Sequence, residues 1–145
     1  MHQQLPARED AIVKYMIMLY GSQLDYDVLA GRPTGEPPMS AAEVAAMHAQ
    51  MDSVHDGLVT SGELVDAQGL TAPAQARRVR LQHGLPVVTD GPYPETQEVL
   101  AGYTVVECDS LARATEIAGS LINPAAEGEY VDVRPVLGSV ADLEV

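Results

Sequence analysis

The chain begins its regular part with a run from Ile12 to Tyr20 that is apolar on both faces. This pattern is typical of a central strand that is covered on each side. Residues 1–11 are mostly polar and are interpreted as a flexible lead-in. Residues 21–39 contain three glycines and three prolines and predict a long loop without regular structure. A loop of this length in a compact domain often has a functional role.

The next segment has the signature of an amphipathic helix. Ser40 and Glu43 stand in the order of a capping box, in which each side chain satisfies a free backbone amide of the first turn. Gly62 is placed to end the helix. The positions at helical spacing that predict its buried stripe are Val44, Met47, Met51, Val54 and Leu58.

After the predicted helix, the pattern of polar and apolar residues changes to one that is typical of strands. A strand is expected from Glu63, and Pro73 should interrupt what comes after it. Residues 77–82 alternate between polar and apolar positions, Gly84 marks a turn, and residues 86–89 complete a hairpin. The predicted hairpin leads directly into Asp90.

The remaining pattern predicts a strand, a helix and a last strand. The strand covers residues 103–108, and the helix begins after a cap at Asp109 or Ser110 and ends at Asn123-Pro124. The last strand covers residues 130–136. The predicted buried stripe of the helix is Leu111, Ala114, Ile117 or Ala118, and Leu121.

This order is an α+β plan, βαββαβ with an extra β-hairpin, in which the helices cover one face of an antiparallel sheet. The other face has no covering layer in the sequence. We therefore expect a second copy to cover it, as a two-fold homodimer with a barrel-like shape. The domain is assigned to residues 12–137, and residues 138–145 are assigned to a C-terminal tail.

Composition narrows the classes of partner. Eight basic and 21 acidic residues give a formal charge of −13, which repels nucleic acids and anionic membranes. The run that follows the polar N-terminus is too short to cross a bilayer, and we expect a cytoplasmic protein. Cys108 is the single cysteine and is interpreted as a small core residue.

The segment Asp90-Gly91-Pro92-Tyr93-Pro94-Glu95-Thr96-Gln97-Glu98 has few backbone options. Two prolines stiffen it, and Gly91 can adopt conformations closed to other residues. An aspartate at a turn usually accepts from the amide two residues on, but that residue is Pro92. Asp90 is therefore a candidate for chemistry, with acceptance from the Tyr93 amide as the alternative. Glu95 and Glu98 are interpreted as solvated carboxylates on a short helical turn that Pro94 opens at its first position.

This segment, followed by Gly102-Tyr103, resembles the signature of the YCII-related proteins of the DGPF-domain type. Further similar blocks are Lys14-Tyr15-Met16, Val79-Arg80, Asp109-Ser110-Leu111 and Val133-Arg134-Pro135-Val136. The resemblance implies a ferredoxin-like fold and a dimeric α+β barrel. It departs at Tyr93, where phenylalanine is usual, and at Gln97, where lysine is usual.

The resemblance also implies a pocket that contains a histidine and an aspartate. Asp90 matches the aspartate of the signature. Counting back from Gly62 places Met51 where a helix histidine is expected, so His48 can serve only if the helix is shifted.

Two functions follow as hypotheses. The first is an enzyme without a cofactor that acts on a small metabolite, with Asp90 moving a proton and His48 or Tyr103 as its partner. Arg80 or Arg134 would bind a substrate carboxylate, and Tyr93 would contact the ligand; each arginine is alternatively an ion-pair partner on a strand. The second is a non-catalytic dimeric module that binds a ligand, for which the resemblance implies a sigma-factor-type protein partner. A metal site from His48, His55, Asp90 and Glu95 is a weaker alternative because the spacing is not characteristic.

Overall fold

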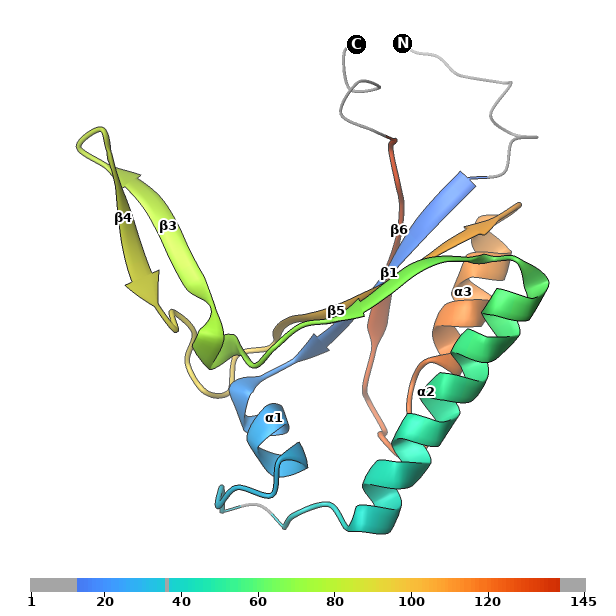
Figure 1. Cartoon of the computed structure of the whole chain (residues 1–145), viewed down its shortest axis with the longest axis horizontal. Coiled ribbons are helices and arrows are strands. Elements are labelled where there is room, and N and C mark those ends of the chain that lie inside the picture. Colours follow the sequence, from blue (N-terminus) through green and yellow to red (C-terminus); the bar gives the residue numbers. More distant parts are fainter. Residues whose placement is uncertain (1–12, 36, 139–145) are drawn as a thin grey trace.

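The computed structural model describes residues 13–35 and 37–138 and is organised around a four-stranded sheet (Figure 1). Every strand pairing in this sheet is antiparallel, and the strand order is β2-β5-β1-β6. The first strand therefore lies inside the sheet, as its apolar run predicted. The strands are β1 (Val13–Gly21), β2 (Leu64–Gly69), β5 (Val99–Cys108) and β6 (Val131–Pro135).

The long helix α2 (Ala41–Ser61) begins and ends where the sequence predicted. The Ser40 hydroxyl accepts from the Glu43 amide at 3.1 Å, and the Glu43 carboxylate accepts from the Ser40 amide at 2.9 Å. Gly62 has a φ of +81°, a left-handed conformation that glycine adopts without steric cost. The capping box and the glycine together fix the length of α2.

The core lies between one face of the sheet and the helices α2 and α3 (Leu111–Ser120). Ile17 and Val106 are fully buried on the sheet, and Cys108 is buried beside them as predicted. Leu111 was predicted to belong to the buried stripe of α3, but it is half-exposed because the stripe begins one turn later. The helical side chains in the core are Leu58, Ala114, Ile117, Ala118 and Leu121.

The prediction of a loop throughout residues 21–39 is wrong for its first part, which forms α1 (Gln23–Leu29). Ser22 and Asp25 form a second capping box, with amide-to-side-chain distances of 2.8 and 3.2 Å. The Tyr26 hydroxyl donates to the Leu70 carbonyl at 2.9 Å and holds α1 against the end of the sheet. The prolines that favoured a loop all lie after residue 32, beyond the end of α1.

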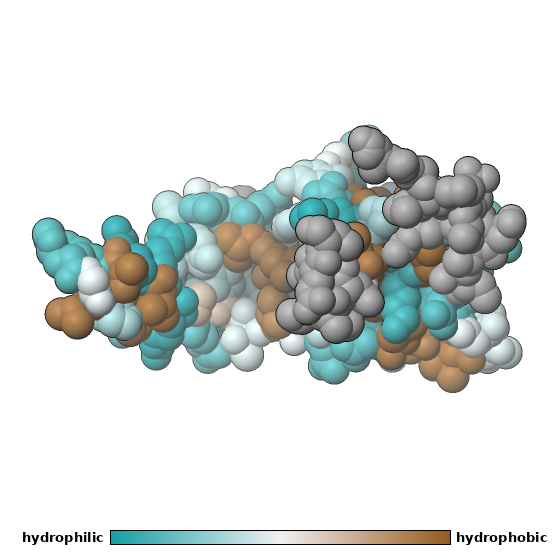
Figure 2. Space-filling view, turned by 90° about the horizontal axis from the view of Figure 1, so that it is seen from above, coloured by the Kyte–Doolittle hydropathy of each residue, from teal (hydrophilic) through white to brown (hydrophobic). Residues whose placement is uncertain are grey.

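The predicted hairpin is present but belongs to a separate two-stranded sheet. After the short 3₁₀ helix η2 (Pro73–Gln75), β3 (Arg77–Gln82) pairs with β4 (Leu85–Asp90). Figure 1 shows the hairpin extending away from the other elements, and Figure 2 shows apolar side chains at that end of the molecule. Every residue of both strands is exposed.

The predicted lead-in, residues 1–11, and all of the predicted tail after residue 138 lie outside the described residues. Within the described part of the chain, none of the helices combines the length and the apolar character that crossing a membrane requires.

Candidate functional site

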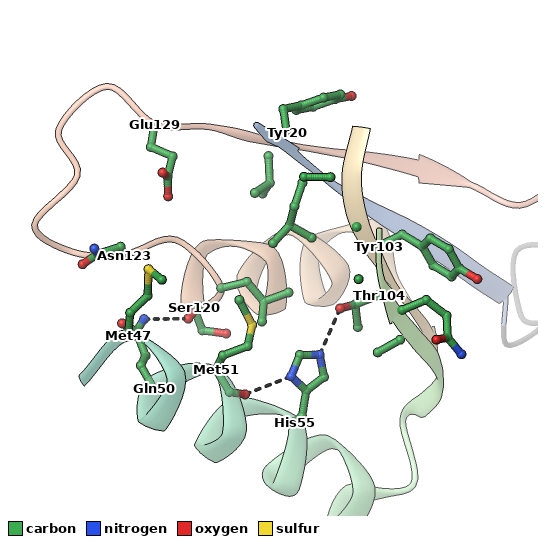
Figure 3. Close-up of a pocket in the computed structure, with 18 of the residues that line it drawn as sticks. Tyr20, Met47, Gln50, Met51, His55, Tyr103, Thr104, Ser120, Asn123 and Glu129 are labelled. Carbon is green, nitrogen blue, oxygen red and sulfur yellow. Dashed lines mark hydrogen bonds between the residues drawn. The ribbon is translucent and has the colours of Figure 1, made fainter. Parts of the chain in front are cut away.

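A cavity of about 540 Å³ lies between α2, the sheet and the loop that follows α3 (Figure 3). Its volume falls in the range of small-molecule sites, roughly 300–1,000 Å³. Met47 and Met51 line it from α2, and Gly69 and Gly102 line it from adjacent strands. Other apolar side chains in the wall are Leu19, Leu29, Leu121 and Val131.

His55 is held in the wall of this cavity by two hydrogen bonds. Its Nδ1 lies 2.9 Å from the Met51 carbonyl oxygen, and its Nε2 lies 3.0 Å from the Thr104 hydroxyl (Figure 3). A carbonyl oxygen only accepts, so Nδ1 carries the hydrogen. In the neutral ring, Nε2 then accepts from Thr104. Two hydrogen bonds therefore fix both the orientation and the tautomer of His55.

Thr104 lies in the middle of β5 and is 2% exposed. Its neighbours on the same face of the strand, Gly102 and Val106, are also buried. A buried hydroxyl needs a hydrogen-bond partner, and His55 provides it. The cavity wall thus contains a buried hydroxyl and a half-buried imidazole that bond to each other.

The charged groups around the cavity are acidic. Asp52 of α2 and Glu129 of the loop before β6 are both lining residues, and no lysine or arginine is among them. Neither carboxylate forms an ion pair with any of residues 13–35 or 37–138. Figure 3 shows the Glu129 side chain extending from its loop toward α2. This environment favours a neutral or positively charged ligand over an anion.

Three tyrosines at the rim each donate to a carboxylate. The Tyr103 hydroxyl lies 3.2 Å from Asp66, and the Tyr20 hydroxyl lies 2.7 Å from Asp132. These hydrogen bonds to carboxylates raise the pKa of both phenols. For Tyr130 the negative charge of Glu98 is the main cause that raises the pKa. The phenols therefore remain protonated donors.

A second hollow of about 680 Å³ shares Tyr20, Met47 and Tyr130 with the first and adjoins it. It is lined by carboxylates at Asp25, Glu98, Glu127 and Glu129. The two hollows form one acidic concavity at this end of the sheet.

The residues predicted as catalytic are placed elsewhere. Asp90 is the last residue of β4, its side chain is 77% exposed, and its Oδ1 lies 3.0 Å from Arg77 Nε. His48 is exposed on α2. Neither residue lines the cavity of His55. The single chain therefore does not bring Asp90 and His48 together in this cavity, and their catalytic role stays a prediction.

Among the predicted ligand-binding residues, Tyr103 lines the cavity, whereas Arg80 and Arg134 are exposed outside it. Tyr93 is half-buried, and the Arg78 guanidinium lies 5.2 Å from its ring centroid. This distance is that of a cation–π contact. Tyr93 thus contacts an arginine of the hairpin.

The signature loop is fixed by its backbone, as its sequence predicted. Gly91 has a φ of +47°, and a Cβ there would lie 3.2 Å from the Ala74 carbonyl oxygen. The Gly91 amide donates to the Ala76 carbonyl at 2.9 Å, and the Leu24 amide donates to the Glu95 carbonyl at 3.0 Å. Pro94 opens a hydrogen-bonded turn rather than a helix. The loop joins the base of the hairpin to α1.

The weaker alternative of a metal site finds no support in the arrangement. Within the described ranges, no group of three or more histidine, cysteine, aspartate or glutamate side chains is placed to hold a metal ion.

The sequence-based prediction named His55 only in the weaker metal alternative, and it did not single out Thr104, Asp52 or Glu129. Two signals were available. His55 follows Met51, a residue of the buried stripe, by one turn. Thr104 is the one hydroxyl within the buried alternation of β5, and a buried hydroxyl requires a partner.

Comparison with known proteins places the chain in a family. The model of the YCII-related domain matches residues 13–138. The chain is also 31% identical over 86 residues to the uncharacterized protein R00369 of Rhizobium meliloti (strain 1021). That match covers 59% of this chain and 69% of the relative. The chain belongs to the family of YCII-related domain proteins.

Proposed function

We propose that this YCII-related protein binds a small, neutral or positively charged molecule in the cavity between α2 and the sheet. The observation that carries the proposal is the His55–Thr104 pair, which forms a fixed hydrogen-bonding group in an otherwise largely apolar wall. Sites of this kind combine an apolar lining with a few oriented polar groups. The unpaired carboxylates of Asp52 and Glu129 give the preference for a cationic group.

The proposed role of His55 is to accept a hydrogen bond, and in a reactive ligand a proton, through Nε2. The Met51 carbonyl keeps the hydrogen on Nδ1, so that Nε2 presents its lone pair. A ligand hydroxyl or ammonium group that replaces the Thr104 hydroxyl would meet this lone pair. This arrangement supports proton transfer on a small metabolite, and it supports binding without turnover if the ligand has no labile proton at that position.

The test is a thermal-shift screen of wild-type protein against a library of small metabolites, followed by titration calorimetry of the hits. His55→Gln should weaken binding of those hits at least ten-fold, because the imidazole acceptor is lost. His48→Gln is the matched control, since it changes an exposed histidine on the same helix. It should leave the dissociation constants unchanged.

Asp90→Asn separates this site from the site predicted on the signature loop. Binding that survives Asp90→Asn and is lost in His55→Gln supports the cavity. The reverse pattern would refute the cavity proposal and would favour the loop. Turnover of a hit by wild-type protein, lost in His55→Gln with the fold intact by circular dichroism, would distinguish an enzyme from a binding module.

We also propose a ferredoxin-like, dimeric arrangement. The order β2-β5-β1-β6 supports it, with α2 connecting β1 to β2 and α3 connecting β5 to β6. The core and its helices lie on the face of Tyr15 and Ile17, and among the described residues none of the buried core side chains lies on the face of Met16 and Met18. A second copy would cover this open face. Sedimentation of wild-type protein at twice the monomer mass is the expected result, and a monomer at micromolar concentration would contradict it.

A further inference from the structure

The β3–β4 hairpin has two free strand edges, because among the described residues each of its strands pairs only with the other. Figure 1 shows the hairpin standing away from the main sheet. Every residue of both strands is exposed, so solvent reaches both edges. The outer backbone groups of such a strand are a template on which a further strand can pair.

The register shows which backbone groups point outward. In an antiparallel pair, residues that exchange hydrogen bonds alternate with residues whose N–H and C=O groups point away from the partner strand. The Gly91 amide donates to the Ala76 carbonyl at 2.9 Å, and these two residues continue the register of the hairpin. Counting from them, the even-numbered residues of β3 bond to β4. The N–H and C=O groups of Arg77, Val79 and Leu81 therefore point outward.

The two edges of the hairpin are not equivalent. On β4 the outward positions are those paired with the outward residues of β3, namely Pro86, Val88 and Asp90. Proline has no N–H, so the β4 edge lacks a donor at Pro86. The β3 edge contains no proline and keeps all of its donors. A further strand would therefore pair with β3.

The side chains of β3 divide by face. Arg78 and Arg80 lie on one face of the hairpin and Val79 and Leu81 on the other, because successive residues of a strand alternate. Val79 is 64% exposed and Leu81 is 74% exposed. Arg77, at the base of the apolar face, already forms an ion pair within the hairpin. A strand laid along β3 would meet a basic row on one face and an apolar row on the other.

The arginines disfavour pairing of β3 with the β3 of a second copy. An antiparallel pairing centred on Val79 would place Arg78 of each copy opposite Arg80 of the other. Like charges directly opposite each other on neighbouring strands are destabilising, whereas opposite charges are stabilising. The two arginines thus act against a second β3 and in favour of a strand with carboxylates at the facing positions.

The local charge of the hairpin differs from that of the whole chain. Three arginines and one aspartate give residues 77–90 a formal charge of +2, whereas the chain carries −13. Salt screens exposed charges over about 10 Å at 0.1 M ionic strength. A segment on the outer edge of β3 would therefore respond mainly to the positive charge of the hairpin.

We propose that the outer edge of β3 is a docking site for an extended peptide segment of another protein, in which acidic and apolar residues alternate. The segment would add to the hairpin as a third strand, with its backbone bonded to that of Arg77, Val79 and Leu81. Its carboxylates would face Arg78 and Arg80, and its apolar residues would pack on the opposite face. A two-stranded hairpin is only marginally stable in water, and a third strand stabilises it.

The first experiment is a fluorescence-anisotropy titration of labelled, terminally blocked peptides in 0.1 M NaCl. A peptide in which glutamate and valine alternate should bind wild-type protein at least ten-fold more tightly than a peptide of the same composition in which the glutamates and the valines form two blocks. Arg78→Glu with Arg80→Glu should weaken binding of the alternating peptide at least ten-fold. An alternating peptide that does not saturate wild-type protein at millimolar concentration would refute the site.

A matched pair of variants locates the edge. Val79→Pro removes the central donor of the β3 edge and leaves the hydrogen bonds to β4 in place. Val88→Pro makes the same change on the β4 edge, at the residue paired with Val79. Binding of the alternating peptide should be lost in Val79→Pro and retained within two-fold in Val88→Pro. The reverse result would place the peptide on β4 and would contradict the proposal.

A third measurement uses wild-type protein only, so it holds even if the proline variants unfold the hairpin. Glutamates that face the arginines put the valines opposite the outward residues of β3, where the valine amides would donate. N-methylation of the valines should therefore weaken binding at least ten-fold, whereas N-methylation of the glutamates should not. Equal affinities of the two methylated peptides would rule out pairing of strands. Oligomers of wild-type protein that the alternating peptide does not disperse and that Val79→Pro abolishes would assign the edge to a second copy instead.

Discussion

Gly102 of β5 lies beside the cavity and close to the backbone of β2. A Cβ at this position would lie 2.9 Å from the Gln68 carbonyl oxygen and 3.4 Å from the Gly69 Cα. The first of these distances is shorter than real Cβ contacts, and both neighbours are backbone atoms that cannot move without shifting β2. Glycine is therefore required here by space and not by its φ angle.

We predict that Gly102→Ala lowers the free energy of unfolding by about 1–3 kcal/mol, the usual cost of inserting a methyl group into a packed site. Urea denaturation followed by circular dichroism measures it. The control is Gly57→Ala on α2, where nothing lies within 4 Å of the added Cβ. That change should stabilise the protein, since alanine favours the helix by about 0.5–1 kcal/mol. Equal stability of wild type and Gly102→Ala would contradict the predicted clash.

The two histidines of α2 show which part of the site could be predicted from the sequence and which part could not. His48 and His55 are seven residues apart on one side of α2, roughly 10 Å along its axis, and helical periodicity does not say which of them faces the sheet. The sequence-based prediction named His48 as the catalytic candidate. The structure places His55 against Thr104 and leaves His48 exposed. The difference depends on which turn of α2 lies over β5, and only tertiary packing sets that position.

At the scale of elements, an ion pair joins the end of α2 to α3. Arg113 of α3 donates to both oxygens of Glu63, which follows Gly62, with distances of 2.8 and 2.7 Å. Two parallel bonds of this kind are the strongest geometry for arginine and a carboxylate. Arg113 lowers the pKa of the Glu63 carboxyl from 4.5 to about 2.

This shift predicts a loss of stability in acid. The folded state holds Glu63 ionised at a pH where the unfolded chain binds a proton, so the contribution is complete above pH 4.5 and is lost as the pH falls toward about 2. Its size is on the order of 1 kcal/mol, because Arg113 is partly exposed and solvent screens the pair. Chemical denaturation at pH 7, 5, 4 and 3 measures the loss.

Glu63→Gln should remove this part of the pH dependence. The variant should be less stable than wild type at pH 7, and the gap should narrow as the pH falls from 4.5 to 3. Glu95→Gln, on the exposed signature loop, is the control and should follow the wild-type curve. A gap between wild type and Glu63→Gln that stays constant from pH 7 to pH 3 would show that the Glu63 carboxylate does not act through its charge.

Elements with a strong local signal were predicted well. The capping box at Ser40 and Glu43, the ending glycine of α2 and the alternation of β3 all act over a few residues. The helix α1 was missed because the glycines and prolines of residues 31–38 were taken to describe the whole segment from residue 21. Its capping box at Ser22 and Asp25 is as local as that of α2 and had the same predictive value.

At the scale of the whole molecule, charge restricts the ligand. The chain carries −13, and the cavity is lined by Asp52 and Glu129 without a basic residue. The long-range field and the local groups therefore act in the same direction and disfavour anions. Neither Arg80 nor Arg134 lines this cavity, and their role in binding a substrate carboxylate stays a prediction.

We predict that fragments matched in size and differing in charge bind in the order cationic, neutral, anionic. A thermal-shift screen at 10 mM and 300 mM NaCl measures this preference. The order should be steeper at low salt, where screening is weak. Fragments with carboxylate or phosphate groups among the strongest binders at low salt would contradict the proposed ligand class.

The sequence by itself determined most of the helices and strands and the sign of the net charge. Helix caps and periodic patterns depend on residues that are close together in the sequence, and the net charge depends only on how many ionisable residues there are. The sequence also indicated the family, through a loop whose prolines and glycine leave few conformations. Only the tertiary structure decided that His55 meets Thr104, that Asp90 pairs with Arg77 on an exposed hairpin, and that this hairpin stands apart from the sheet. These outcomes depend on how elements distant in the sequence pack against each other.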